Sequence, residues 1–169
     1  REFINGILNT MKMIVATFYK FIPLPDFRER KIPLLKLCEE LEIKGTILLA
    51  LEGINGTISG SEKAINSILN FLRSTPHLSD LEVKFSPAEF FPFQRMKVKL
   101  KKEIVTLGVP TVDPTQQVGI YVSPQEWNEL IQNPEVVLID TRNQYEVNLG
   151  TFKGAQDPHL DSFRQFPEY

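Results

Sequence analysis

The chain contains 169 residues, of which 42% are hydrophobic and 24% are charged, and its formal net charge is −2. These values are typical of a globular protein with a buried core, and they disfavour bulk attraction to nucleic acid, so any such binding needs a local basic patch. The single cysteine, Cys38, excludes an internal disulfide and a zinc site made of cysteines, and no apolar run is long enough to predict a membrane helix. We expect a cytoplasmic setting, no metal and no evident cofactor.

The first predicted elements are a strand and a helix. Residues 13–19 are β-branched and aromatic, which predicts a strand. Apolar residues then recur from Leu34 to Leu41 at the spacing of an amphipathic helix, with Pro33 in its first turn. Cys38 belongs to this apolar stripe, so we expect a buried and unreactive thiol rather than a nucleophile.

Two strands joined by a turn come next. Residues 45–51 predict a buried strand, and residues 57–59 predict its partner. The pair Asn55-Gly56 favours a hairpin turn between them, because both residues tolerate positive φ. The segment from Glu52 to Gly56 could instead present backbone amides and the Asn55 side chain to an anion, but a plain turn is the interpretation we prefer.

A second helix and a fourth strand complete the predicted first domain. Ser61 can cap a helix whose apolar stripe runs from Ile65 to Leu72, and Pro76 ends it. Residues 81–85 alternate in the manner of a strand. The resulting order, β-α-β-β-α-β, is that of the ferredoxin-like fold, and it predicts an α+β first domain within an α/β protein.

A row of basic residues marks an added strand at residues 95–100, which we expect to be followed by another at 103–107. Alternate side chains of a strand share a face, so four cations would line one side while the residues between them enter the core. These cations are Arg95, Lys97, Lys99 and Lys101. Such a row can follow phosphates, and the neighbouring Phe90, Phe91 and Phe93 could stack on bases. From these residues alone, a solubilising outer face is the simpler interpretation.

The composition of the chain changes after residue 107. Residues 108–119 are rich in turn-forming residues, so we place one domain at 12–108, a linker at 109–119 and an incomplete domain at 120–169. Ser123 to Glu126 forms a capping box with proline at the first helical position. Residues 136–139 form a short apolar run, as expected for a strand covered on both faces of a parallel sheet.

The residues after this run suggest architecture rather than catalysis. We expect Arg142 to pair with Glu146, Gly150 to end a short helix and Gly154 to allow close backbone packing. Asp140 lies at the carboxyl end of the predicted strand, where α/β folds place their sites. His77 and His159 stand alone in loop-like segments, so we expect surface residues and no metal site.

The second domain resembles the first half of a rhodanese domain. That family shows an apolar strand ending in Asp-x-Arg, then a Glu, a Gly-His and a Gly-Ala; here these correspond to Asp140-Thr141-Arg142, Glu146, Gly150 and Gly154, with Thr151 in place of the usual His. Residues 17–20, 51–56 and 95–99 resemble the signatures of the rhodanese-containing tRNA uridine hydroxylases. The resemblance covers the chain from about Met13 to its end.

This resemblance implies oxygen-dependent 5-hydroxylation of the wobble uridine in certain bacterial tRNAs, with molecular oxygen as co-substrate and tRNA as partner. It also implies an essential cysteine in a rhodanese loop beyond Tyr169, so no catalytic residue is carried over and this chain alone is expected to be inactive. We expect it to be the N-terminal portion of a longer protein. The resemblance also favours a role in tRNA binding for Arg95, Lys97, Lys99 and Lys101.

Two other functions stay open. A non-catalytic binding or regulatory protein would also fit a truncated rhodanese-like half. An acylphosphatase-like hydrolase would share the β-α-β-β-α-β order, but the loop at 21–28 lacks a glycine-rich phosphate cradle, which leaves Arg28 and Asn55 as candidates. The oligomeric state is not predicted, and Met11 or Met13 is a candidate for the natural start.

Overall fold

The computed structural model describes residues 13–109, 111–116 and 119–169. Compact clusters of contacts divide the chain into two units: unit 1 ends at Ile104, and unit 2 spans Val105–Tyr169. The candidate start Met11, the first residue of the predicted domain at 12–108 and parts of the predicted linker lie outside the described residues. The domain limits at 108 and 119 therefore stay predictions.

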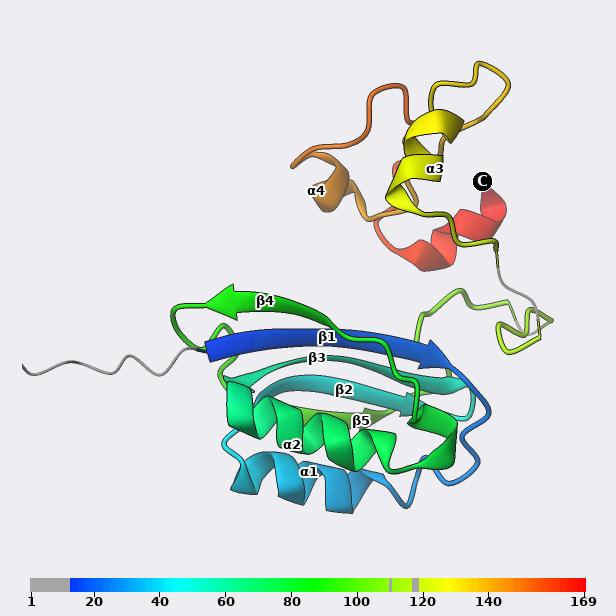
Figure 1. Cartoon of the computed structure of the whole chain (residues 1–169). Helices are drawn as coiled ribbons and strands as arrows, with labels where there is room; N and C mark the ends of the chain where they lie inside the picture. The colour runs from blue at the N-terminus through cyan, green and yellow to red at the C-terminus, as the bar shows by residue number, and fades with distance from the viewer. Residues whose placement is uncertain (1–12, 110, 117–118) are drawn as a thin grey trace, which may run out of the picture. The chain divides into compact units, whose positions relative to one another are not determined.

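Unit 1 is a five-stranded sheet with two helices (Figure 1). Its strands, in chain order, are β1 (Met13–Phe21), β2 (Lys44–Ala50), β3 (Gly53–Ser61), β4 (Lys84–Ala88) and β5 (Met96–Leu100). Their order across the sheet is β4-β1-β3-β2-β5; β5 runs parallel to β2, and the other neighbours are antiparallel. The helices are α1 (Lys31–Glu40) and α2 (Glu62–Arg73). The predicted β-α-β-β-α-β order and the α/β class are confirmed.

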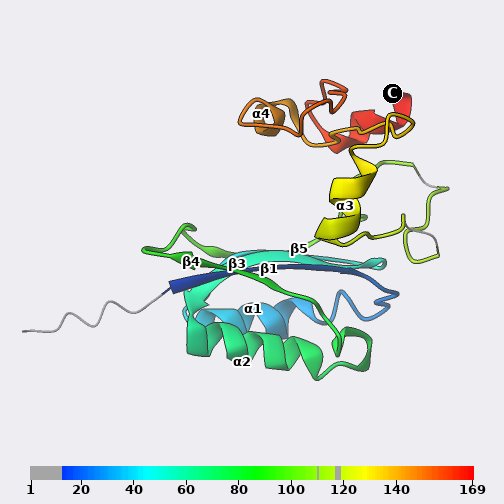
Figure 2. The same cartoon turned by 45° about the horizontal axis from the view of Figure 1, so that its top comes forward.

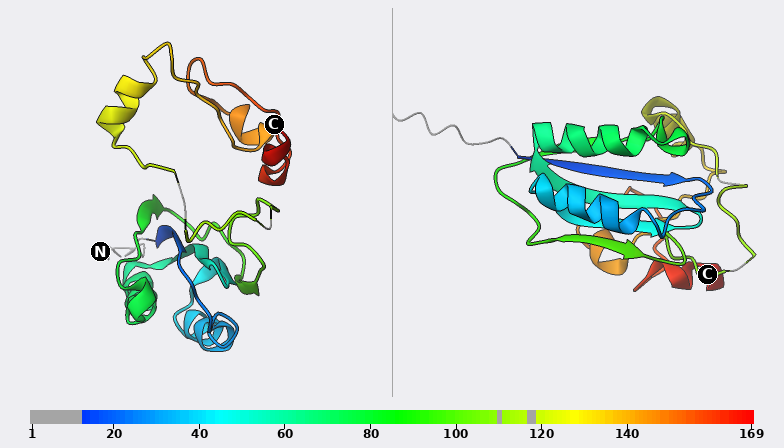
Figure 3. Two further views of the ribbon diagram at one scale, coloured as in Figure 1. Left: turned by 90° about the vertical axis from the view of Figure 1, so that its right-hand side faces the viewer. Right: turned by 90° about the horizontal axis from the view of Figure 1, so that it is seen from below.

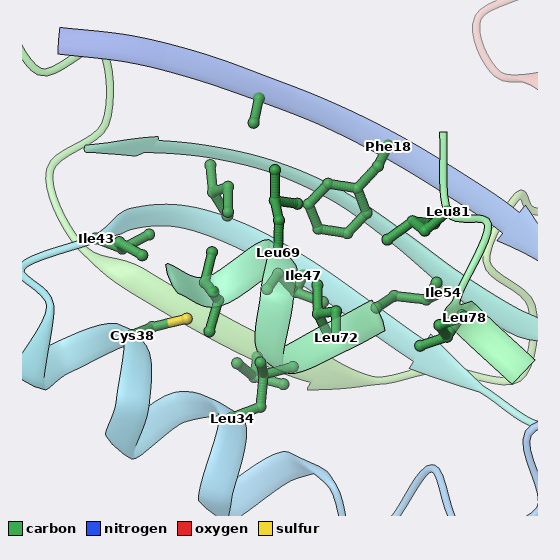
Figure 4. Close-up of a cluster of buried hydrophobic side chains, with 14 of the residues drawn as sticks. Phe18, Leu34, Cys38, Ile43, Ile47, Ile54, Leu69, Leu72, Leu78 and Leu81 are labelled. Carbon is green, nitrogen blue, oxygen red and sulfur yellow. The ribbon is translucent and has the colours of Figure 1, made fainter. Parts of the chain in front are cut away.

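Both helices cover the same face of the sheet, as Figure 2 shows edge-on and Figure 3 from below. The apolar stripe of α2 is buried from Ala64 to Leu72, and the Ser61 hydroxyl accepts a hydrogen bond from the Ala64 N–H at 3.2 Å, which confirms the predicted cap. Cys38 and Leu34 bring α1 into the same core (Figure 4). Neither α1 nor α2 lies on the opposite face of the sheet.

The predicted hairpin turn at Asn55-Gly56 is wrong. The chain turns at Leu51-Glu52, and Asn55 and Gly56 lie inside β3, paired with Leu48 and Ile47 of β2. The glycine is needed for packing: a Cβ at Gly56 would lie 2.6 Å from Cζ of Phe18 on the neighbouring strand. Gly56, which in the sequence indicates a turn, therefore leaves the space that the Phe18 ring fills.

Two other strand predictions need correction. The fourth strand begins at Lys84 rather than Leu81, because Leu81 packs into the core and donates its N–H to the Leu78 carbonyl after a short 3₁₀ turn (Pro76–Leu78). Residues 103–107 form no strand, because the peptide groups of Ile104 are bound by side chains rather than by a neighbouring strand.

Unit 2 contains α3 (Pro124–Leu130), α4 (Gln144–Val147) and a terminal 3₁₀ segment (Phe163–Glu168). The predicted capping box at Ser123 and Glu126 is present. The predicted covered strand at 136–139 is wrong: only Ile139 forms a bridge, to Gln156, and Val137 is 65% exposed. A parallel strand needs neighbours on both sides, and the described part of unit 2 does not provide them.

None of the helices in the described ranges combines the length and the apolar character that crossing a bilayer requires.

Candidate nucleic-acid interface

The basic row lies on the face of the sheet opposite α1 and α2, here called the uncovered face because neither helix packs on it. In the parallel pairing of β5 with β2, Lys97 is in register with Thr46, and Val98 is in register with the buried Ile47. Val98 is only 5% exposed and belongs to the core beneath the helices. Because side chains alternate along a strand, Lys97 and Lys99 point to the face without helices, as the sequence predicts.

The four cations are available to a partner. Lys99, Lys101 and Arg95 are exposed, and Lys97 is half-buried. No ion pair joins any of them to another residue in the described part of the chain. The backbone fixes both ends of the row, because the Gly45 N–H donates to the Arg95 carbonyl at 3.1 Å and the Lys101 N–H donates to the Leu49 carbonyl at 2.9 Å.

Aromatic rings lie beside the start of this row. Phe90 is 74% exposed, and the Lys44 ammonium nitrogen lies 4.2 Å from the centre of the Phe91 ring. This cation–π contact holds the segment before β5 against β2. No local sequence pattern indicates Lys44, because it belongs to a different strand from the aromatic segment and only the fold brings them together.

The segment after β5 is held by two side chains from the β2–β3 turn region. The Glu52 carboxylate accepts the Ile104 N–H at 2.6 Å, and the Asn55 amide donates to the Ile104 carbonyl at 3.0 Å. Ile104 itself is buried. The Asn55 amide is therefore used inside the fold, and the alternative prediction of an anion site at this segment has no support from these contacts.

The acylphosphatase-like alternative finds no assembled site. The N–H groups of Ile22 and Leu24, in the loop after β1, donate to the carbonyls of Glu52 and Leu51. Arg28 stacks over the Phe27 ring at 4.9 Å, while Asn55 is bound to Ile104. The two candidate phosphate ligands thus have separate partners.

Asp140 organises the loop that follows it in unit 2. Its carboxylate accepts hydrogen bonds from the Arg142 guanidinium at 2.9 and 2.6 Å and from the Thr151 hydroxyl at 2.7 Å. These bonds, led by the one from Arg142, hold the pKa of Asp140 well below its usual range. The Arg142 guanidinium also donates to the Gly150 carbonyl at 2.7 Å, so it ties the two ends of the loop together.

The predicted pairing of Arg142 with Glu146 is wrong. The Glu146 carboxylate instead accepts the Asn143 N–H at 3.2 Å as part of a capping box on α4. Arg142 prefers Asp140, because a guanidinium and a carboxylate two residues apart can form a bidentate pair here. Thr151, noted in the sequence only as a departure from a family pattern, supplies a hydroxyl to the same carboxylate.

Gly150 and Gly154 both adopt positive φ, 146° and 81°. The short helix α4 ends at Val147 with Asn148 as its C-cap, so the prediction that Gly150 ends it is wrong; Gly150 lies two residues after the cap and donates its N–H to the Val147 carbonyl. A Cβ at Gly154 would meet no atom within 4 Å, so its φ rather than close packing explains this glycine.

The remaining candidates are a buried thiol and two exposed histidines. Cys38 is fully buried, and burial raises the pKa of its thiol to about 12. His77 and His159 are exposed, as predicted. Within the described ranges, no three His, Cys, Asp or Glu side chains gather as a group that could hold a metal ion.

Relatives of the chain share its sequence over most of its length. A tRNA uridine(34) hydroxylase of Picosynechococcus sp. is 56% identical over 92% of this chain and 52% of its own length. A protein of the same name from Rhizobium leguminosarum bv. trifolii is 52% identical over 98% of this chain and 53% of its own length. Another from Albidiferax ferrireducens is 53% identical over 94% of this chain and 50% of its own length. The chain therefore spans about half the length of the curated relatives it matches.

Likeness to solved structures is weak. The BLUF protein BlrB has a TM-score of 0.44 and 17% identity, and the match covers 59% of this chain and 80% of BlrB. An acylphosphatase from Coxiella burnetii has a TM-score of 0.34 and 17% identity, and the match covers 52% of this chain and 92% of the acylphosphatase. The UPF0176 acylphosphatase like domain, however, matches residues 13–104, which is more than half of the sequence and nearly all of unit 1. The chain belongs to the family defined by this domain.

Proposed function

We propose that this chain is the N-terminal portion of a cytoplasmic tRNA-modifying oxidoreductase that hydroxylates uridine 34, with molecular oxygen as co-substrate. The proposal is supported by three relatives of that name at 52–56% identity. The reactive group that this chemistry needs is proposed to lie in the part of the relatives that the chain does not span. Cys38, the single cysteine of the chain, does not supply it, because its thiol is buried and has a raised pKa.

Within this activity, we propose that unit 1 binds tRNA through the uncovered face of its sheet. The observation that carries this role is the row of cations on β5 and its flanks, which has no ion-pair partner among the described residues. An overall negative charge of −2 makes such a local patch necessary for a polyanionic substrate. Lysine and arginine side chains on phosphates release counterions, so the interaction depends on salt.

The test replaces all four cations, Arg95, Lys97, Lys99 and Lys101, by Gln in the full-length protein. Loss of up to four phosphate contacts should reduce the slope of log affinity against log salt by about 3 and weaken tRNA binding most at low salt. Binding is measured by fluorescence anisotropy with labelled tRNA at several salt concentrations.

A matched control changes four cations on or near the helices on the other face of the sheet. Arg28, Lys31, Lys36 and Lys63, one arginine and three lysines, become Gln. Both variants lose the same charge, so the proposal requires the first to bind tRNA much more weakly than the second. Equal affinity of the two variants at every salt concentration would contradict it.

A further inference from the structure

A pocket opens at the start of the basic row. It measures about 380 Å³ and is lined by Gly45, Thr46, Pro92, Phe93, Gln94, Arg95 and Lys97. Thr46 and Lys97 are in register on the uncovered face of the sheet, so the pocket belongs to the face that carries the cations. Its volume lies in the lower part of the range of small-ligand sites, which is large enough for one nucleotide.

The lining combines the three groups that a nucleotide needs. Phe93 offers an aromatic surface, the Gln94 amide has both a donor and an acceptor, and Arg95 and Lys97 carry positive charge. None of the seven lining residues is acidic. A second pocket in unit 1, about 280 Å³, is lined mostly by apolar residues, and its acidic residues Asp26 and Glu29 lie beside Arg30, which pairs with Asp26.

Neighbouring contacts fix the wall of this pocket before any ligand arrives. The Lys44 ammonium lies over the Phe91 ring, and the Arg95 carbonyl accepts the Gly45 N–H. The segment that carries Phe93 and Gln94 is therefore attached to β2 both before and after these residues. A site that is already formed loses little entropy on binding.

We propose that this pocket binds one unpaired nucleotide of an RNA, with its base against Phe93 and its phosphate at Arg95 and Lys97. This inference rests on the proposed function and names the part of a tRNA that the sheet recognises: a loop rather than a stem. Bases inside a duplex are stacked on their neighbours and cannot reach an aromatic side chain, whereas a loop base can.

The test compares two RNA probes of equal length and charge, a short stem–loop and a fully paired duplex. Phe93→Leu in the full chain removes the ring but keeps an apolar side chain, and it should weaken stem–loop binding about tenfold while duplex binding and the salt slope stay unchanged. Phe71→Leu, at the second pocket, is the control and should change neither. An equal loss for both probes, or no loss for the stem–loop, would overturn the pocket assignment.

A second measurement does not depend on a substitution. A stem–loop with 4-thiouridine in its loop is cross-linked by light to the unsubstituted chain, and the tryptic fragments are identified by mass spectrometry. The pocket predicts a cross-link in the fragment from Phe85 to Arg95, and cross-links confined to other fragments would overturn it. If the variant without the four cations binds tRNA like the unsubstituted protein, the tRNA-binding role proposed for unit 1 fails. If only the Phe93 and cross-linking results fail, the basic row keeps that role without the pocket.

Discussion

Cys38 projects from α1 into the core between Leu34 and Ile43 (Figure 4). Burial, and secondarily the carboxylate of Glu39, raise the pKa of its thiol from 9.0 to about 12. A thiolate is the reactive form of cysteine, so this side chain is a packing group. The apolar stripe in the sequence already indicates this role, since it places the thiol on the buried face of the helix.

The raised pKa of Cys38 makes stability depend on pH. Below pH 9 the thiol is protonated in both the folded and the unfolded chain. Above pH 9 the unfolded chain loses this proton while the folded chain keeps it. The free energy of unfolding therefore falls as the pH rises from 9.0 towards 12. The contribution should decrease by about 1.4 kcal/mol per pH unit in this window. Urea unfolding at several pH values measures it, with Cys38→Ala as reference.

Cys38→Ala should lower the free energy of unfolding by about 1 kcal/mol at neutral pH, because a buried sulfur leaves a small cavity. Since the alanine variant has no thiol to ionise, the difference between the two proteins should shrink above pH 9 and change sign at about pH 10. A constant difference up to pH 11 would show that the thiol ionises equally in both states.

Gly56 makes a second prediction at the scale of one residue. Its missing side chain leaves room for the Phe18 ring, whose Cε2 atom would lie 2.8 Å from an added Cβ. Gly56→Ala should therefore destabilise the protein by about 1–3 kcal/mol through overpacking. Gly60→Ala on the same strand is the control, because its nearest neighbour, Cγ1 of Ile43, lies 3.3 Å away. Chemical denaturation measures both, and equal costs would refute the packing explanation.

At the scale of elements, the segment after β5 is placed by residues far away in the sequence. Glu52 and Asn55 bind the two peptide groups of Ile104 from 52 and 49 positions away. Because each bond satisfies a partly buried polar group, removing one leaves its partner unpaired. The segment Leu51–Gly56, a motif in the sequence, thus positions the chain just after β5.

Asn55→Ala should loosen this attachment. Loss of the hydrogen bond to the Ile104 carbonyl costs about 1–1.5 kcal/mol, which should speed hydrogen exchange of the Ile104 N–H about tenfold. Thr57→Ala, two residues further along the same strand and on the same face, should leave that rate unchanged. Exchange measured by NMR decides the matter, and unaltered protection at Ile104 would show that Asn55 is not needed there.

At the scale of the whole molecule, the two units differ in how much core they contain. The large buried cluster lies entirely in unit 1, whereas Val147 and Leu160 are the buried apolar residues in the described part of unit 2. Large apolar side chains of unit 2, such as Leu149 and Ile120, are 88% and 94% exposed. Unit 2 therefore buries too little apolar surface to offset the loss of chain entropy by itself.

Separate fragments should show this difference. Residues 13–104 alone should unfold in one cooperative transition on heating, because they contain the whole five-stranded sheet and both of its helices. Residues 105–169 alone should show a gradual change without a transition. Circular dichroism and calorimetry measure both, and a sharp transition in the second fragment would contradict the estimate of its core.

What the sequence determined is the local part of the structure. The order of strands and helices, the cap at Ser61, the buried stripe with Cys38 and the alternation of the cations on β5 all depend on residues within one element, whose periodicity is visible in the sequence. The resemblance stated from motifs also agrees with the relatives found by comparison.

Only the tertiary structure decided which distant groups meet. Gly56 packs beneath Phe18 instead of forming a turn, Ile104 is bound from the β2–β3 region, and Lys44 joins the Phe91 ring. Each of these contacts spans strands, and no local pattern records which strands are neighbours or in what register. The position of Arg142 on Asp140 rather than Glu146 has the same cause on a smaller scale: the backbone path of the loop selects the partner, and charge alone does not.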